Sequence, residues 1–169
     1  MERVVLVDEN DNPLGTMEKM EAHEKGLLHR AFSVFIFNNN GEMLLQQRAF
    51  SKYHSGGLWT NTCCSHPREG ETTIEAAHRR LQEEMGFDCE IEKAFDFIYK
   101  KDLDKGLIEH EFDHVFIGQF EGEVCFNKEE VNAYVYNPVH AVVEEVNQKP
   151  EKYTEWFKIC LDEVVKRVL

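Results

Sequence analysis

The apolar and polar positions divide the 169-residue chain into short segments separated by turn residues. Residues 3–7 (RVVLV) are typical of a strand, and turn residues follow at 11–15. The stretch 17–24 predicts a helix. Residues 30–48 predict a β-hairpin, because two apolar runs flank the loop Asn38–Gly41.

The clearest helix pattern lies at 70–86, where apolar residues recur three or four positions apart. Thr72 or Thr73 can cap its start, and Gly86 can end it. The apolar positions of this helix are Ile74, Ala77, Leu81 and Met85.

The remaining segments complete a mixed pattern. Strands followed by helices, with one helix inserted midway, favour an α/β or α+β sandwich. We find no linker, repeat or low-complexity stretch, so we expect one domain over residues 1–169. The further strands are expected at 58–66, 88–99, 107–120 and 132–136, and two helices from Pro138 onward.

Charge and composition narrow the function. The chain has 19 basic and 32 acidic residues, a net charge of −13, and 42% hydrophobic residues. The hydrophobic content indicates a folded core, while the acidic excess argues against non-specific binding to nucleic acid and against docking on anionic lipid. We therefore expect any anionic ligand to be held by local cations.

The N-terminus and the cysteines indicate a cytoplasmic location. MERVVLVDEN has no basic region followed by an apolar one, and no apolar run approaches the roughly 18 to 20 residues that span a bilayer. An odd number of cysteines, two of them adjacent, suits reduced thiols better than a disulfide framework. The cysteines are Cys63, Cys64, Cys89, Cys125 and Cys160.

The sequence HEFDH at 110–114 matches the HExxH pattern of zinc proteases. Its aromatic and β-branched surroundings favour a strand, on which His110 and His114 would lie about 13 Å apart, too far to share one ion. The same geometry places Glu109 and Glu111 on one face about 7 Å apart. This pair either holds one cation or is solvated.

On the strand predicted at 58–66, two adjacent thiols point to opposite faces. Cys64 and His66 share one face, and Cys63 lies on the other. Cys64 is therefore the candidate reactive thiol. The alternative is that both cysteines are small buried apolar groups and that His66 caps a turn.

The helix at 70–86 places Arg80 and Glu84 together at the edge of its apolar face. They either turn toward a partly buried site or form a surface ion pair, which stabilises a helix by about 0.3 kcal/mol.

The run 70–87 resembles the Nudix box, a loop and helix that hold a divalent cation against a diphosphate. The chain departs from the common box at Ser65, where a glycine is expected, and at Arg80, where a glutamate is expected. Both departures weigh against ordinary diphosphate hydrolysis. The matching residues of the box are Gly70, Glu71, Arg79, Leu81, Glu83, Glu84 and Gly86.

Together with LHRAFS at 28–33, WTNT at 59–62, CSHP at 64–67 and EHE at 109–111, the chain resembles the type I isopentenyl diphosphate isomerases from about Lys19 to Trp156. The resemblance implies a Nudix-like α/β/α sandwich with a mixed central sheet. It also implies an isomerase of isoprenoid biosynthesis that interconverts isopentenyl and dimethylallyl diphosphate. That reaction proceeds by protonation and deprotonation through a tertiary carbocation.

The resemblance further implies two metal sites. Nitrogen and oxygen ligands together suit Zn²⁺, Mn²⁺ or Mg²⁺ at the first site. Glu84, assisted by the Cys64 carbonyl, is expected to hold Mg²⁺ bound with the substrate diphosphate. The expected ligands of the first ion are His23, His29, His66, Glu109 and Glu111.

The catalytic pair implied by the resemblance is Cys64 and Glu111, with Tyr99 hydrogen-bonding nearby. Trp156 is expected to cover the carbocation, which a π face stabilises by about 0.5 to 2 kcal/mol. The sequence leaves open which of the pair is the acid and which the base. The expected diphosphate contacts are Lys19, Arg48, Lys52 and Arg80.

Two other functions remain as alternatives. A Nudix hydrolase of another diphosphate ester would release phosphate, and a non-catalytic metal-binding module would leave the four cations without a purpose. The expected partner is a small-molecule isoprenoid diphosphate, and we expect a monomer or weak dimer.

Overall fold

The computed structural model describes residues 2–169, which form four α-helices and one mixed sheet of nine strands. Short 3₁₀ turns lie at Asp104–Gly106 and Pro150–Lys152. The strands are β1 (Arg3–Val7), β2 (Pro13–Glu18), β3 (His29–Phe37), β4 (Glu42–Arg48), β5 (Trp59–Thr60), β6 (Cys63–Ser65), β7 (Ile91–Asp102), β8 (Ile108–Gln119) and β9 (Val131–Pro138). The helices are α1 (Lys19–Lys25), α2 (Thr73–Met85), α3 (Val139–Gln148) and α4 (Glu155–Val168).

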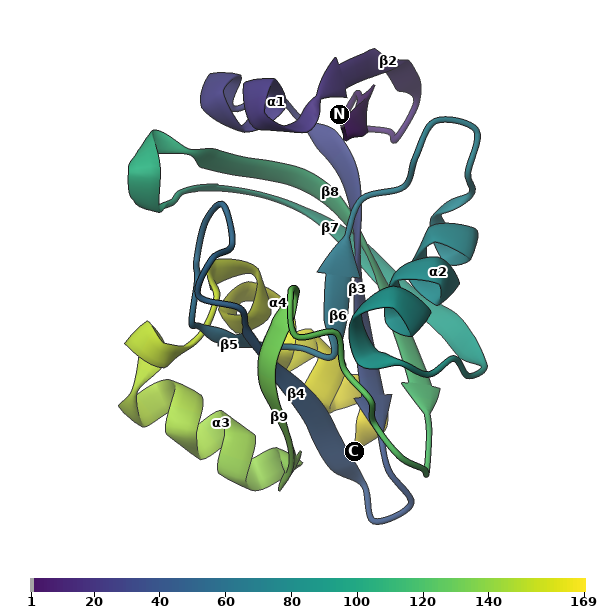
Figure 1. Cartoon of the computed structure of the whole chain (residues 1–169), viewed down its shortest axis with the longest axis vertical. Coiled ribbons are helices and arrows are strands. Elements are labelled where there is room, and N and C mark those ends of the chain that lie inside the picture. Colours follow the sequence, from purple (N-terminus) through teal and green to yellow (C-terminus); the bar gives the residue numbers. More distant parts are fainter. Residues whose placement is uncertain (1) are drawn as a thin grey trace.

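Strand β3 is the centre of the sheet. It pairs in parallel with β8 along its whole length and antiparallel with β1, β4 and β6. Alternate side chains of β3 enter two separate cores, so helices cover both faces. In Figure 1, α2 lies in front of the sheet and α4 behind it. This confirms the predicted α+β sandwich with a mixed central sheet.

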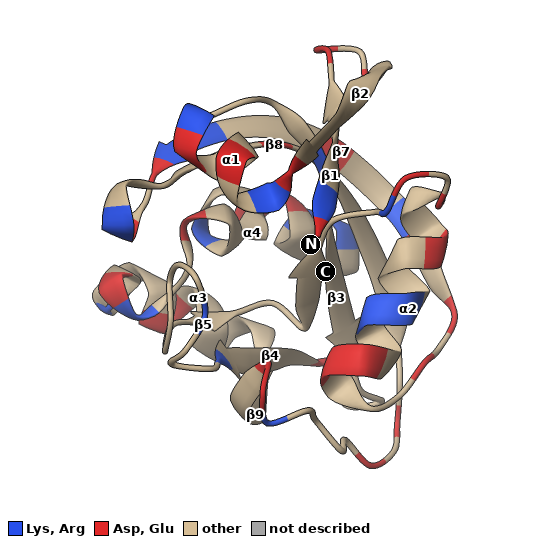
Figure 2. Cartoon of the chain, turned by 45° about the horizontal axis from the view of Figure 1, so that its top comes forward, with Lys and Arg blue, Asp and Glu red and all other residues tan. Residues whose placement is uncertain are grey.

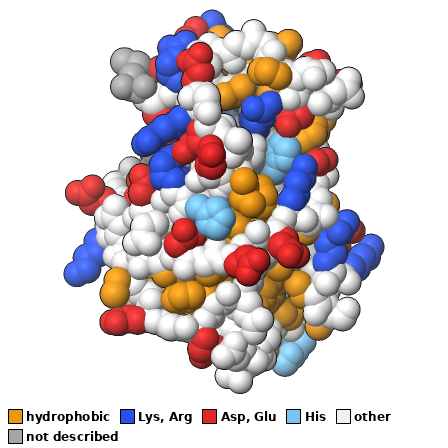
Figure 3. All heavy atoms as spheres, turned by 90° about the vertical axis from the view of Figure 1, so that its right-hand side faces the viewer, with side chains coloured by type: hydrophobic (Ala, Val, Ile, Leu, Met, Phe, Trp, Pro, Cys, Tyr) orange, Lys and Arg blue, Asp and Glu red, His pale blue; other side chains and the backbone are white. Residues whose placement is uncertain are grey.

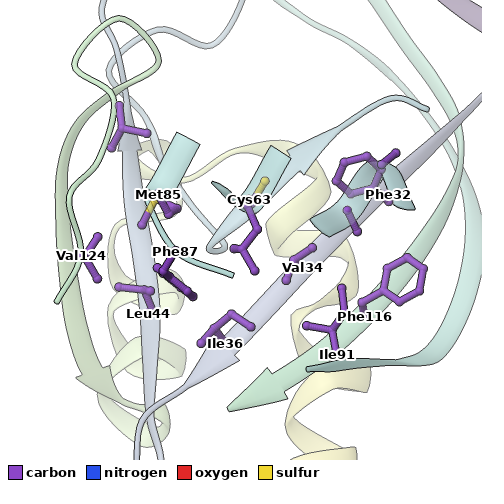
Figure 4. Packing of buried hydrophobic residues seen from close by; sticks show 14 residues of the cluster. Phe32, Val34, Ile36, Leu44, Cys63, Met85, Phe87, Ile91, Phe116 and Val124 are labelled. Carbon is purple, nitrogen blue, oxygen red and sulfur yellow. The ribbon is translucent and has the colours of Figure 1, made fainter. Parts of the chain in front are cut away.

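The core beneath α2 joins the helix to β3, β4 and β8. Leu81 and Met85 of α2 are fully buried there, and Cys63 of β6 lies in the same cluster. Figure 4 shows Met85 and Phe87 packed near Leu44, with Cys63 between them and Phe32. The predicted apolar helix face is confirmed except at Ile74, which is 40% exposed.

The predicted hairpin at 30–48 forms, but its strands separate after Phe37 and Met43. The segment 61–65 enters the gap. The Thr62 hydroxyl accepts from Ile36 N at 2.9 Å and donates to Leu44 O at 2.7 Å, so one side chain links both strands. The strand expected at 58–66 is therefore two short strands, β5 on β4 and β6 on β3.

The N-terminal region differs from the sequence-based expectation. Residues 13–18 form β2, which pairs with β1, and the helix starts at Lys19 instead of position 17. Glu18 caps α1, since its side chain accepts from Met20 N and Glu21 N. The turn residues at 11–15 thus open a hairpin whose edge strand tolerates Pro13 at its first position.

The other expected elements form with shifts at their ends. The capping box of Thr72 and the left-handed Gly86 bound α2 as predicted. The two C-terminal helices also form. Over residues 2–169, no helix is long and apolar enough to cross a membrane.

Gly86 gives a test of the packing at the end of α2. Its φ is +73°, and a Cβ there would lie 2.1 Å from Cys125 O, whereas Gly41 has the same φ and open space around it. We expect Gly41→Ala to cost about 1 kcal/mol of unfolding free energy, the usual left-handed penalty. Gly86→Ala should cost about 1 to 3 kcal/mol more, because the backbone must move.

Urea unfolding monitored by circular dichroism measures both variants. Equal losses at the two glycines would contradict the close approach of Cys125 to the helix end.

Candidate active site

A cavity of about 70 Å³ lies at one end of the sheet. It is lined from α1, β8, α4, the loop after β4 and the segment around β6. The structure brings together here most of the residues that the sequence assigned to a site. Those that line the cavity are Lys19, Arg48, Lys52, Cys64, His66, Arg80, Glu109, Glu111 and Trp156.

The five expected ligands of the first metal ion converge at this cavity. Each contributes one ligand atom, and these atoms lie within 4.8 Å of one another. All five side chains are buried. They come from α1 (His23), the first residue of β3 (His29), the residue after β6 (His66) and the early part of β8 (Glu109 and Glu111).

Strand pairing explains why Glu111 lies at the centre. Its neighbours across the sheet are His29 in β3 and Tyr99 in β7. Tyr99 Oη donates to Glu111 Oε1 at 2.6 Å, and His66 Nε2 lies 2.8 Å from Glu111 Oε2. The expected hydrogen bond from Tyr99 is thus present.

The HExxH match is not a metal site. His110 and His114 lie on a strand, and each has its own partner away from the cavity. His110 Nδ1 lies 3.0 Å from Gly26 O, and His114 Nε2 lies 2.9 Å from Asp11 Oδ2. The predicted strand at 110–114 is confirmed, and its two histidines do not face a common site.

The donor set fits a divalent cation. His23 Nδ1 faces Lys19 O at 2.7 Å and His29 Nδ1 faces Leu27 O at 2.9 Å, and because a carbonyl only accepts, both Nε2 atoms present lone pairs. Within residues 2–169, neither Nε2 nor Glu109 Oε1 has a hydrogen-bond partner, although all three are buried. Buried lone pairs that face one another are costly without a cation between them.

The electrostatics of Glu109 agree with this arrangement. Without a bound cation, Glu109 raises the pKa of the His23 and His29 imidazoles, and in their protonated form these rings hold the pKa of the Glu109 carboxyl well below its usual range despite burial. Glu109 is therefore a carboxylate at neutral pH, which is the form that binds metal ions.

The adjacent thiols point to opposite sides of β6, as predicted. Cys64 lines the cavity, whereas Cys63 is fully buried beneath α2 and donates to Glu84 Oε2 at 3.3 Å. Burial raises the pKa of Cys64 well above its usual range, and the Arg48 guanidinium offsets only part of this. Cys64 therefore carries its proton at neutral pH.

Arg80 and Glu84 are paired on α2, with Arg80 Nε 3.1 Å from Glu84 Oε2. Glu84 Oε1 accepts from Gln46 Nε2 at 3.2 Å. The Glu84 carboxylate thus lies on the α2 side of β6, beside Cys63, and is not among the described residues that line the cavity. Its role as a Mg²⁺ ligand stays a prediction.

All four expected diphosphate contacts line the cavity, and three of them are in ion pairs. Lys19 Nζ lies 2.8 Å from Glu2, while Lys52 Nζ lies 2.5 Å and Arg80 Nη2 lies 3.3 Å from Glu130 Oε2. Figure 2 shows basic and acidic segments side by side on α1 and α2, and the face in Figure 3 carries both signs interspersed. An entering anion therefore competes with carboxylates.

Four residues of the cavity escaped the sequence analysis. Glu2 and Glu130 are far from the motifs along the chain, so no local pattern marks them. The other two are Tyr53 and His54. Their position next to Lys52, in the loop that joins the hairpin to the strand with the two cysteines, was the only sequence signal for them.

The raised pKa of Cys64 predicts slow alkylation. The thiolate is the reactive form, so iodoacetamide at pH 8 should modify Cys64 at least about tenfold more slowly than the exposed Cys125. The Cys64 rate should rise with pH through pH 10. Peptide mapping by mass spectrometry gives both rates in one sample, and equal rates at pH 8 would contradict the burial of the thiol.

Comparisons with known proteins agree with the geometry. The NUDIX domain family matches residues 27–157. The chain is 50% identical to "Isopentenyl-diphosphate Delta-isomerase 2" of Aromatoleum aromaticum over 97% of this chain and 87% of that protein. It is 54% identical to the protein of the same name from Photorhabdus laumondii over 93% of this chain and 89% of that protein.

Solved structures are similar in fold. A crystal structure of a Deinococcus radiodurans protein superposes with a TM-score of 0.78 at 19% identity and covers 99% of both chains. The NUDIX domain of Shewanella oneidensis NrtR, solved with ADP ribose, superposes with a TM-score of 0.65 at 15% identity and covers 90% of this chain and 94% of that chain.

Proposed function

The chain belongs to the NUDIX family and, within it, to the isopentenyl-diphosphate Delta-isomerases. From that premise we propose that it interconverts isopentenyl and dimethylallyl diphosphate in the cavity at the end of the sheet. The observation that carries the site assignment is one cavity lined by Cys64, by Glu111 and by four cations. A hydrolase would need neither the thiol nor the buried histidines.

Moving the double bond requires one proton to be added and another to be removed. An unactivated alkene is a weak base, so both transfers need positioned groups and a dry site. Cys64 is half-buried and holds a proton on Sγ, and Glu111 is oriented by Tyr99 and His66. The reaction is reversible, so each group donates in one direction and accepts in the other.

The carbocation between the two transfers must be kept from water. Trp156 is buried at the cavity wall, with its ring 5.3 Å from the Arg48 guanidinium. Its π face can stabilise positive charge by about 0.5 to 2 kcal/mol and excludes solvent at the same time. We assign Trp156 to the cover over the carbocation.

The mixed set of three histidines and two glutamates supports one divalent ion, Zn²⁺, Mn²⁺ or Mg²⁺. When bound, this ion supplies positive charge that fixes the orientation of Glu111 and tunes its acidity. Glu84 is assigned to a Mg²⁺ that arrives with the diphosphate. For this, its contacts with Arg80 and Cys63 would have to rearrange.

The diphosphate is assigned to Lys19, Arg48, Lys52 and Arg80, which line the cavity. Arginine forks match phosphate oxygens, and lysine adds a mobile point charge. Glu2 and Glu130 hold three of these cations in the free protein and would release them to the substrate.

The remaining parts of the proposal concern the context of the enzyme. Five free cysteines support a reducing compartment such as the cytoplasm. The acidic net charge of −13 supports a small-molecule partner over nucleic acid or an anionic membrane. We assign residues 1–169 to a single isomerase domain that acts as a monomer or weak dimer.

The reaction itself is the first test. Incubation with Mg²⁺ and isopentenyl diphosphate in D₂O should give the allylic isomer with deuterium incorporated and no phosphate released, as followed by proton NMR. Cys64→Ala should lower kcat about 10²- to 10⁴-fold, which is the usual contribution of a proton-transfer group. Phosphate release would favour the hydrolase instead.

Cys63→Ala is the matched control for this variant. It removes a thiol one residue away that faces the α2 core, so it should reduce stability and keep most of the activity. Retained activity in Cys64→Ala would refute the role of that thiol.

A second test concerns the diphosphate. Lys52→Ala should raise KM about tenfold, which corresponds to ~1.4 kcal/mol and lies near the value of a charged hydrogen bond. Lys93→Ala removes an exposed lysine paired with Asp96 and should leave KM unchanged. A KM shift of the same size in both variants would mean that only the overall charge matters.

A further inference from the structure

A fourth histidine lies against the metal centre. His54 is in the loop between β4 and β5 and is 1% exposed. Its Nε2 lies 3.2 Å from Glu109 Oε2, and within residues 2–169 this nitrogen forms no complete hydrogen bond. A buried polar nitrogen needs a partner, and this oxygen is within hydrogen-bonding distance.

The two oxygens of Glu109 face different neighbours. Oε1 lies 3.0 Å from His23 Nε2 and 3.5 Å from His29 Nε2, inside the expected ligand set. Oε2 is turned away from that set toward His54. If Oε1 binds an ion, the direction in which it points depends on what holds Oε2.

The neighbour of Nδ1 differs between His54 and the expected ligands. His23 and His29 present Nδ1 to backbone carbonyls, which fixes the proton on Nδ1 and leaves a lone pair on Nε2. His54 Nδ1 instead faces the Ser55 hydroxyl at 3.0 Å, and a hydroxyl can donate. His54 can therefore keep its proton on Nε2 and donate it to Glu109.

The same loop carries one expected diphosphate contact, Lys52, and contacts a second, Arg48, at the end of β4. Arg48 Nη2 donates to the His54 carbonyl at 3.2 Å, and Lys52 is two residues away. The His54 ring packs edge-on against Trp156 at 5.7 Å and against Tyr53 at 4.3 Å. His54 thus fixes the loop to the cavity wall from both its backbone and its side chain.

We propose that His54 is a positioning residue that holds the outer oxygen of Glu109, so that the inner oxygen faces His23 and His29, and that it joins the diphosphate-binding loop to the metal centre. The proposal rests on the proposed function only for the existence of the metal site. It assigns His54 to Glu109, not to the ion itself.

The test measures Zn²⁺ affinity without substrate, by competition with a chromophoric chelator. His54→Leu should bind Zn²⁺ about tenfold more weakly than the unchanged protein and still take up one ion at saturation, because loss of a group that orients a ligand costs 10- to 100-fold in affinity. His54→Gln should restore most of the affinity, since its amide nitrogen can reach the place of Nε2.

His140→Leu is the matched control, because this histidine is exposed on α3 and should not affect Zn²⁺ binding. His29→Ala serves as the reference for a lost ligand. Circular dichroism of the metal-free variants checks that each is folded.

Three results would overturn the proposal. Unchanged affinity in His54→Leu would separate His54 from Glu109, and a loss of the ion as complete as in His29→Ala would make it a ligand. Equal weakening in the Leu and Gln variants would mean that ring packing, not the donor, matters. Because no substrate is present, failure of the isomerase assay leaves these outcomes interpretable.

A second variant serves if His54→Leu does not fold. Ser55→Ala keeps the imidazole and removes the hydroxyl that faces Nδ1, so the tautomer is no longer selected. We expect Zn²⁺ affinity to fall about threefold. Affinity equal to that of the unchanged protein would overturn the proposed tautomer.

Discussion

The opening between β3 and β4 is the constraint on which the rest of the site depends. The two strands pair only near their turn, and beyond it the Thr62 hydroxyl satisfies a donor of one strand and an acceptor of the other. This bridge fixes the register of β6 on β3. Because successive side chains of a strand point to opposite faces, a slip of one residue would exchange Cys64 in the cavity for Cys63 in the core.

The same alternation brings the two glutamates of the candidate metal site together, and His23 of α1 and His66 after β6 complete the ligand set. Glu109 and Glu111 share one face of β8, and Tyr99 and His29 lie beside Glu111 in the adjacent strands. Burying two carboxylates and three imidazoles together costs free energy, which a divalent cation offsets. His54 extends this arrangement outward, since the loop that carries the proposed diphosphate contact Lys52 also contacts the carboxylate of the proposed metal ligand Glu109.

The acidic surface is compatible with an anionic substrate because the positive charges are concentrated at one cavity. The chain has 13 more negative than positive charges, yet four cations meet at one cavity and are partly neutralised by Glu2 and Glu130. The paired carboxylates keep the cations ordered in the free protein. On the proposed assignment, the substrate diphosphate displaces these carboxylates from the cations.

The sequence by itself determined the elements with strong local signals: the capped helix α2, the hairpin at β3 and β4, the opposite faces of Cys63 and Cys64, and the strand that excludes a protease site at 110–114. Strand β2, the division of β5 from β6, and the positions of His54 and Glu130 were decided only by the tertiary structure. Local periodicity encodes which face a side chain occupies, whereas contacts between distant segments depend on strand pairing and on which buried polar groups find partners, and neither is written in any short stretch of the chain.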